Sequence, residues 1–265
     1  MHKNKPDWTK LITPEMAEVV AHIRQWNEEH PATSNYLQDY MDERVFWNDG
    51  GPVPAKVIEV EIEGPYGKIP CRLHYPRISD QPMGMMLYAH GGSLYLGNND
   101  THSRIMRTLT EKSDTVVIGV DYHLAPQNRF PKWIKECVVA TKYFRAHAAE
   151  YGLDANDVSF AGDSAGAWLS MATMLWLRDE DPDISYVTSL LLYYGLYGMY
   201  DSPTQRLYGN EIDGMMREYD EKLYPASIVD EEDVKSPHCD LLYNDLTQNV
   251  PPCFICTGTI DPLAD

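Results

Sequence analysis

A serine in a glycine-flanked segment, Gly162-Asp163-Ser164-Ala165-Gly166, has the surroundings that nucleophilic catalysis needs. The preceding residues 158–161 are typical of a short buried strand, and residues 165–178 are typical of a helix because they are rich in Ala, Met, Leu and Trp. Glycine on both sides allows the tight turn that exposes a serine hydroxyl between strand and helix. The amide groups of the helix N-terminus favour an oxyanion beside it. The segment therefore predicts that Ser164 is an acyl-transfer nucleophile, with an ordinary glycine-rich turn as the alternative.

A second glycine-rich segment, His90-Gly91-Gly92-Ser93, follows the apolar residues 85–89. The tetrahedral oxyanion of acyl transfer needs backbone N–H groups on a loop without obstructing side chains. In the α/β-hydrolase arrangement such a loop follows the third strand and acts together with the N–H of the residue after the nucleophile. We expect the histidine to order this loop by hydrogen bonding. The predicted oxyanion-hole residues are His90, Gly91, Gly92 and Ala165.

The third candidate is Asp261, which follows the apolar residues 252–257. Seven apolar segments are predicted to be strands: residues 57–62, 69–75, 85–89, 115–120, 158–161, 188–194 and 252–257. In this count the glycine loop follows the third strand, Ser164 the fifth and Asp261 the seventh. An α/β-hydrolase carries its oxyanion hole, nucleophile and acid at these positions, in the chain order Ser, Asp, His. The sequence thus predicts that fold, an α/β class with a mostly parallel sheet and helices on both faces.

The general base of such a triad is not found after the acid. None of the nine histidines follows Asp261, although the fold places the histidine after an eighth strand. His238 is interpreted as a loop residue, His123 as a brace for its loop and His90 as part of the oxyanion segment. We therefore expect the chain to be C-terminally truncated, with its last strand and C-terminal helix missing. Residues 1–265 alone are expected to be inactive for lack of the base.

Several segments resemble the hormone-sensitive-lipase family of carboxylesterases. They are the Gly-Asp-Ser-Ala-Gly segment at 162–166, the His-Gly-Gly segment at 90–92 and the Asp-Tyr-His-Leu-Ala-Pro segment at 121–126. Longer stretches are similar, more narrowly, to the bacterial acetyl esterases of the enterobacterial type: residues 96–98, 100–102, 104–107, 175–179, 194–198 and 250–255. The similarity extends from about Glu15 to Asp265.

The resemblance implies an esterase that cleaves short-chain acyl (acetyl) esters without a cofactor, with Ser164 as the nucleophile and Asp261 as the acid. It also implies a helical cap, formed by about residues 1–50 and 196–235, on a single domain of residues 1–265. The sequence departs from the family where Ser93 replaces a third glycine and Gln127 replaces a glutamate. Relatives of this type are thought to bind a transcription activator. A catalytically inactive regulatory or binding protein on the same fold is therefore the alternative.

Helix signals lie between the predicted strands and before them. Thr13 is the predicted N-cap of a helix with Pro14 at its first position, and residues 35–47 form a second helical segment. Crossover helices are predicted over residues 104–112, 131–150 and 165–178. One apolar stripe is expected to face the sheet: Trp133, Ile134, Cys137, Val138, Thr141 and Phe144.

Composition limits the partners and the compartment. The net charge of −18 argues against nucleic acid and anionic membrane surfaces as partners. No zinc-ligand spacing, P-loop or Rossmann glycine pattern occurs, so no metal or nucleotide is predicted. The first residues lack a long apolar segment, so we expect no signal peptide. The five cysteines are expected to be reduced and mostly buried, as in a cytoplasmic protein. The expected partner is a small-molecule acyl ester, and a homodimer is left open.

Overall fold

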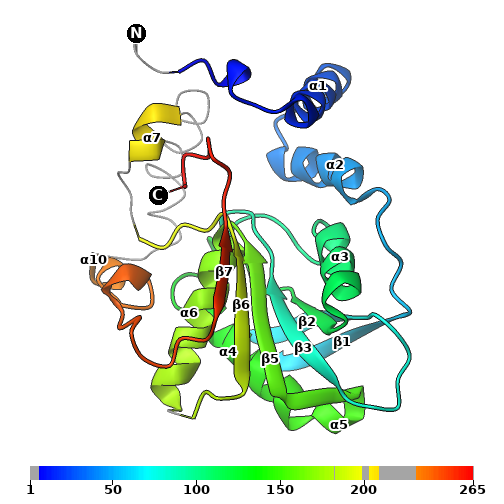
Figure 1. Cartoon of the computed structure of the whole chain (residues 1–265), viewed down its shortest axis with the longest axis vertical. Helices are drawn as coiled ribbons and strands as arrows, with labels where there is room; N and C mark the ends of the chain where they lie inside the picture. Colours follow the sequence, from blue (N-terminus) through cyan, green and yellow to red (C-terminus); the bar gives the residue numbers. More distant parts are fainter. Residues whose placement is uncertain (1–5, 182, 199–202, 209–230, 265) are drawn as a thin grey trace.

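A seven-stranded sheet forms the centre of the protein in the computed structural model, which describes residues 6–181, 183–198, 203–208 and 231–264 (Figure 1). The strand order is β1-β2-β4-β3-β5-β6-β7. β2 runs antiparallel to β1 and β4, and the remaining neighbours are parallel. The strands are β1 (Lys56–Gly64), β2 (Gly67–Tyr75), β3 (Met83–Ala89), β4 (Val116–Val120), β5 (Leu153–Asp163), β6 (Val187–Tyr193) and β7 (Cys253–Cys256). All seven predicted strands are confirmed, and so is the mostly parallel sheet.

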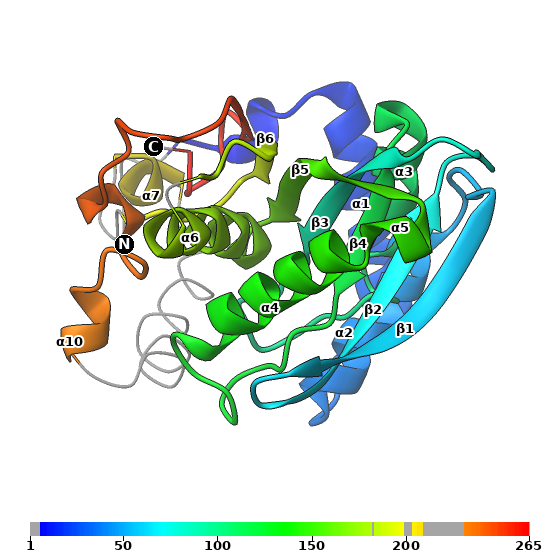
Figure 2. The ribbon, with the colours of Figure 1, turned by 90° about the horizontal axis from the view of Figure 1, so that it is seen from below.

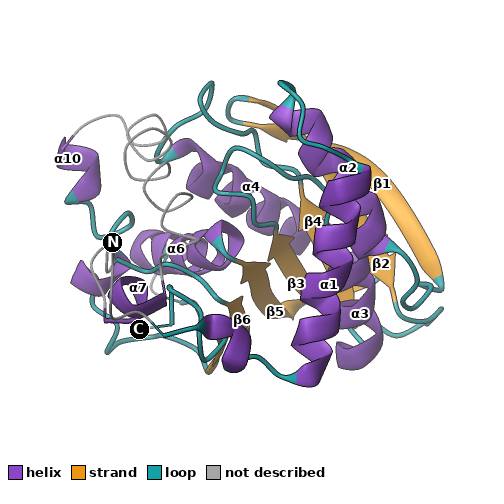
Figure 3. Cartoon of the chain, turned by 90° about the horizontal axis from the view of Figure 1, so that it is seen from above, coloured by secondary structure: helices purple, strands orange, loops and turns teal. Residues whose placement is uncertain are grey.

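Helices cover both faces of this sheet, as the sequence predicts (Figures 2 and 3). α3 packs on one face, and α4 and α6 pack together on the other. The α-helices are α1 (Pro14–Glu29), α2 (Tyr36–Asn48), α3 (Ser103–Ser113), α4 (Lys132–Ala146), α5 (Ala148–Tyr151), α6 (Ala165–Glu180), α7 (Pro203–Tyr208) and α10 (Glu231–Val234). Short 3-10 helices, η1 (Trp8–Lys10) and η3 (Leu241–Tyr243), complete the described elements. The helix expected over residues 131–150 is two helices, because the backbone at His147 leaves the helical conformation.

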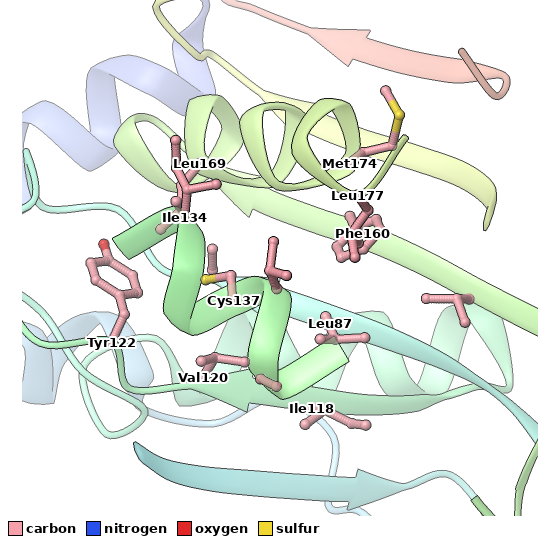
Figure 4. Packing of buried hydrophobic residues seen from close by; sticks show 14 of the residues in the cluster. Leu87, Ile118, Val120, Tyr122, Ile134, Cys137, Phe160, Leu169, Met174 and Leu177 are labelled. Atoms are coloured by element: carbon pink, nitrogen blue, oxygen red, sulfur yellow. The ribbon is translucent and has the colours of Figure 1, made fainter. Parts of the chain in front are cut away.

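Alternation along the strands supplies an apolar core to each face. Met85 and Leu87 on β3 point to the larger core beneath α4 and α6, whereas Met86 and Tyr88 point to a smaller core beneath α3. Figure 4 shows the larger core, where Leu87 and Phe160 from the sheet meet side chains of both helices. Every member of the stripe predicted on α4 is buried. Burial of the side chains in the larger core sets the distance of α6 from the sheet. It therefore also sets the position of the turn that precedes α6.

The two N-terminal helices lie together, away from the main core. The Thr13 hydroxyl accepts a hydrogen bond from the Met16 N–H (3.3 Å), which confirms the predicted N-cap. None of the α1 side chains is buried, and α1 contacts α2 through the rings of Trp26 and Phe46. α2 is joined to the start of α3, since the Asn48 side chain accepts from the Arg104 N–H (2.7 Å). Figure 3 shows α1, α2 and α3 side by side. Much of the second predicted cap segment, residues 199–202 and 209–230, lies outside the described residues.

The cysteines are free thiols, as predicted. Cys71, Cys137 and Cys239 are buried, but Cys253 and Cys256 are exposed because β7 is the edge strand of the described sheet. Phe254 and Ile255 on the same strand are 56% and 61% exposed.

Candidate active site

The turn at Ser164 joins the end of β5 to the start of α6. Its φ of 53° and ψ of −123° form a conformation that side-chain-bearing residues rarely adopt, with a cost of about 1–3 kcal/mol. The Ser164 N–H donates to the Tyr193 carbonyl at the end of β6 (2.8 Å), which holds the turn in place. A Cβ on Gly162 would collide with the Gly166 carbonyl, and a Cβ on Gly166 with the Ala89 carbonyl. The glycines are therefore needed for the close approach of β3, the turn and α6.

The glycine-rich loop begins beside this turn, because Ala89 at the end of β3 pairs with Gly162 of β5. Gly92 has a φ of 115°, and its carbonyl accepts from the N–H groups of two following residues at 2.9 Å. Ser93, which stands where the resemblance implies a glycine, has a φ of 55°. The serine thus keeps the left-handed backbone that glycine adopts freely, at an energetic cost that glycine does not have.

Asp163 connects the loop to the turn. Its carboxylate is buried and accepts from the Tyr88 hydroxyl (2.5 Å) and the Gly91 N–H (2.9 Å), and His102 Nε2 lies 3.4 Å away. Burial raises the pKa of Asp163, but the hydrogen bonds from His102, Tyr88 and Gly91 outweigh burial, so its pKa lies below the usual value. The residue is therefore a carboxylate at neutral pH. It anchors the glycine-rich loop from the position next to Ser164.

The hydrogen bond between Asp163 and the Gly91 N–H gives Gly91 and Gly92 different roles. The Gly91 N–H is directed at Asp163, so Gly91 is not placed to donate to an oxyanion at the same time. The Gly92 N–H has no such acceptor among the described residues, and Ala165 opens α6, where the first N–H groups have no partner within the helix. Of the predicted oxyanion residues, Gly92 and Ala165 are the ones that the geometry favours as donors, and Gly91 fixes the loop.

His90 orders the loop as a neutral side chain. Burial, and then the neighbouring His102, lowers the pKa of His90 to about 4. Its Nδ1 lies 2.8 Å from the Gly91 carbonyl, and the Tyr122 hydroxyl donates to the His90 carbonyl (2.7 Å). The ring stacks on Tyr122 with centroids 4.4 Å apart. These contacts agree with the predicted structural part for His90.

The other singled-out histidines have structural partners far from the turn in sequence. His123 faces the buried Glu136, which accepts from its N–H (2.8 Å) and lies 2.6 Å from its Nδ1. His238 Nε2 lies 2.9 Å from an Asp179 carboxylate oxygen. His123 thus braces its loop and His238 is a loop residue, as the sequence predicts.

Asp261 lies after β7, at the same edge of the sheet as the Ser164 turn and the glycine loop. The parallel strands β3, β5, β6 and β7 all end at this edge. Asp261 is half-buried, and its carboxylate accepts from the Leu263 N–H (2.8 Å). Its charge reaches the phenol of Tyr194, whose pKa is raised first by burial of the hydroxyl, then by Asp163 and, more weakly, by Asp261. Among the described residues, no histidine contacts Asp261. The described part of the chain therefore places two triad candidates, Ser164 and Asp261, at this edge of the sheet, and no histidine beside Asp261.

Sequence reasoning missed the residues that support the site from behind. Asp163, Tyr88 and His102 come from three different segments and meet only in the fold. One sequence feature could have indicated the role of Asp163: it is a charged residue at the last position of a buried strand. A buried carboxylate without partners is costly, so partners are expected there.

Known proteins resemble this chain along most of its length. A family model described as "alpha/beta hydrolase fold" matches residues 86–265. An acetyl esterase of Salmonella typhi is 45% identical over 228 residues, which cover 86% of this chain and 70% of that protein. A hyperthermophilic esterase from Pyrobaculum calidifontis superposes with a TM-score of 0.82 at 25% identity, covering 95% of this chain and 81% of the other. A thermostable carboxylesterase from a metagenomic library gives a TM-score of 0.79 at 26% identity, covering 88% and 79%.

Within the described ranges, no helix combines the length and the apolar character needed to cross a bilayer.

The family match spans more than half of the chain, and it includes the glycine loop, the Ser164 turn and Asp261. The strand order and the parallel pairing from β3 to β7 agree with it. The chain therefore belongs to the α/β-hydrolase fold family.

Proposed function

We propose that this protein is a serine carboxylesterase that hydrolyses short-chain acyl esters, with Ser164 as its nucleophile. The observation that carries the proposal is the strained backbone of Ser164, with a positive φ of 53°, between β5 and α6 and beside a glycine loop that follows the neighbouring strand. The names of the similar proteins, acetyl esterase and carboxylesterase, support the same reaction class. No observation favours the alternative of an inactive binding protein.

The reaction begins when Ser164 Oγ attacks the acyl carbon of the ester. The C=O π electrons move to the carbonyl oxygen, and the resulting oxyanion accepts hydrogen bonds from the N–H groups of Gly92 and Ala165. Collapse of the tetrahedral intermediate breaks the C–O bond to the alcohol, which leaves with the proton that the base took from Ser164. Water then hydrolyses the acyl-enzyme, which releases the carboxylic acid and restores the serine hydroxyl. Asp163 keeps the loop in register with the turn through the Gly91 N–H (2.9 Å).

A base must take the Ser164 proton, and we propose that it is a histidine oriented by Asp261 and not contained in residues 1–265. His90 is buried and neutral, while His123 and His238 face Glu136 and Asp179. A neutral serine hydroxyl is a poor nucleophile, and the residues of a triad act as a unit. Residues 1–265 alone should therefore hydrolyse p-nitrophenyl acetate at close to the background rate. Turnover at the rate of the complete gene product would refute this assignment.

The nucleophile is tested by Ser164→Ala in the complete gene product. Loss of a triad nucleophile lowers kcat by about 10⁴- to 10⁶-fold. Ser79→Ala is the matched control, because the Ser79 hydroxyl donates only to the nearby Gln81 carbonyl on an exposed loop. Activity retained in Ser164→Ala would exclude the proposed mechanism.

The substrate class follows from crowding near the oxyanion loop. Ser93 adds a side chain where the resemblance implies glycine, and we propose that Tyr197 borders the mouth of the site. Acyl chains of two to four carbons should therefore react faster than long ones, each methylene in a fitted pocket being worth about 1–3 kcal/mol. The chain-length profile of p-nitrophenyl esters measures this, and a maximum at long acyl chains would contradict it.

The proposal also covers the domain organisation of the enzyme and its cellular compartment. We propose a single domain with a cap formed by α1, α2 and the segment about residues 196–235, acting in the cytoplasm. The homodimer and the transcription-activator partner implied by the resemblance stay predictions.

A further inference from the structure

A pocket of about 360 Å³ lies between helices α2 and α3, against the nucleophile turn. Its floor includes Asp163 and Tyr194. Asp163 directly precedes Ser164, and consecutive Cα atoms are about 3.8 Å apart, so the pocket adjoins the proposed site of attack. Its volume is within the range of small-molecule pockets, about 300–1,000 Å³. The two helices contribute Arg44, Trp47, Asn48, Arg104 and Thr108 to its walls.

Two guanidinium groups in this pocket lack an acidic partner. Arg44 is half-buried, its Nε is buried with no hydrogen-bond partner, and its guanidinium lies over the Tyr40 ring (4.5 Å to the centroid). Arg104, which is exposed, makes no ion pair with any described residue. Elsewhere in this acid-rich chain, Arg72 and Arg77 both bind carboxylates. Two guanidinium groups that line one pocket without an acidic partner favour an anionic acceptor there.

Three other polar side chains of the pocket, Asn48, Thr108 and Trp47, are already used. The Asn48 amide donates to two carbonyls (2.8 Å each), and its oxygen accepts from the Arg104 N–H. The Thr108 hydroxyl donates to the Arg104 carbonyl (2.8 Å), and the Trp47 N–H donates to Glu43 (2.9 Å). The guanidinium groups, together with the Tyr194 hydroxyl, are thus donors left for a ligand.

The one carboxylate among the lining residues does not neutralise them. Both oxygens of Asp163 face other donors: Tyr88 and Gly91 on one side and His102 on the other. The net charge of −18 repels anions at long range, but salt screens that field beyond about 8 Å at physiological ionic strength. At short range the two guanidinium groups make the electrostatic potential in the pocket positive.

We propose that this pocket binds a carboxylate group of the ester substrate, so that the enzyme acts on esters whose acyl or alcohol part is itself acidic. A guanidinium binds a planar carboxylate through parallel N–H···O bonds, which suits Arg44 and Arg104 facing one cavity. This inference rests on the proposed function for calling the ligand a substrate. Binding to the pocket does not depend on the chemistry at Ser164.

The test is calorimetric titration of the Ser164→Ala protein with monomethyl succinate, an ester that carries a carboxylate, and with the neutral dimethyl succinate. We expect saturable binding of monomethyl succinate that Arg44→Gln and Arg104→Gln each weaken about 10- to 100-fold, the loss of a charge-assisted bond. Arg24→Gln, the same change on the exposed surface of α1, should leave the affinity unchanged. Dimethyl succinate should bind alike in all variants.

Arg104 is exposed, so Arg104→Gln keeps the test valid even if Arg44→Gln fails to fold. Equal affinity of monomethyl succinate in Arg104→Gln and in the unchanged protein would overturn the proposal, and so would the absence of saturable binding. If binding follows the arginines but activity survives Ser164→Ala, the pocket stands and the proposed nucleophile fails. In the complete gene product the arginine substitutions should lower kcat/KM for monomethyl succinate by a larger factor than kcat/KM for dimethyl succinate.

Discussion

Replacing Asp163 by asparagine tests the support of the glycine-rich loop separately from the proposed nucleophile, Ser164. The buried carboxylate accepts from Tyr88 (2.5 Å) and Gly91 (2.9 Å), with His102 Nε2 at 3.4 Å. Asparagine has nearly the same shape, but it keeps one acceptor oxygen and carries no charge. It can retain neutral hydrogen bonds from Tyr88 and Gly91, and it presents an NH₂ group to His102 where a carboxylate oxygen was.

The magnitude follows from these three contacts. Hydrogen bonds to a charged group contribute about 1.5–3 kcal/mol, against about 1 kcal/mol for neutral ones. Weakening two bonds and losing one should lower the free energy of unfolding by about 3 kcal/mol, or Tm by about 6–12 °C for a chain of this size. Because the Gly91 N–H holds the loop, kcat of the complete gene product should fall by about 10²- to 10³-fold, as when an oxyanion donor is lost.

The assay is thermal denaturation followed by circular dichroism, with ester hydrolysis measured on the same samples. Asp80→Asn, on an exposed loop, is the matched control and should change neither quantity. The folded pKa of Asp163 lies below its unfolded value near 3.8, so its stabilisation is complete above that pH and is lost as the pH falls through the folded pKa. Asp163→Asn should lack this acid dependence. Unchanged Tm and unchanged kcat in Asp163→Asn would refute the coupling of loop and turn.

Three further predictions concern burial, packing and the sheet edge. Burial lowers the pKa of both His74 and His90 from 6.5 to about 4, so between pH 7 and pH 5 the unfolded chain binds protons that the folded chain excludes. The free energy of unfolding should therefore fall by about 2 kcal/mol per histidine, and urea titrations of His74→Gln should show half of this pH dependence; an unchanged dependence would contradict the burial argument. Gly166→Ala drives a Cβ into the Ala89 carbonyl and should cost about 3 kcal/mol in thermal denaturation, whereas an unchanged Tm would mean that β3 and α6 can separate there. Ile255 is 61% exposed on the edge strand, so Ile255→Lys should reduce self-association in sedimentation velocity, and identical profiles would show that β7 is not the contact.

The order of elements was predictable from the sequence because apolar runs mark buried parallel strands. Each of the seven predicted strands exists, and the glycine loop, Ser164 and Asp261 follow β3, β5 and β7 as expected. The N-cap at Thr13 was predictable because it depends only on neighbouring residues: the Thr13 hydroxyl accepts a hydrogen bond from the first turn of the helix that Pro14 begins.

Contacts between distant segments were not predictable in the same way. β5 begins at Leu153, five residues before the predicted start, because Asp154, Asn156 and Asp157 interrupt the apolar run although the backbone still pairs with β3. The hydrogen bonds that Asp163 accepts from Tyr88 and Gly91 join residues 75 and 72 positions apart, and no local sequence pattern predicts them. The pocket arginines lie on two helices whose approach depends on the Asn48–Arg104 contact.

The central claim, that Ser164 attacks the acyl carbon, is tested most directly by covalent labelling. The complete gene product is treated with an organophosphonate, and the modified peptide is identified by mass spectrometry while esterase activity is followed. We expect one label per chain, on Ser164, with activity falling in proportion to labelling, and much slower labelling of residues 1–265 alone. A label on another serine, or full activity after stoichiometric labelling, would contradict it.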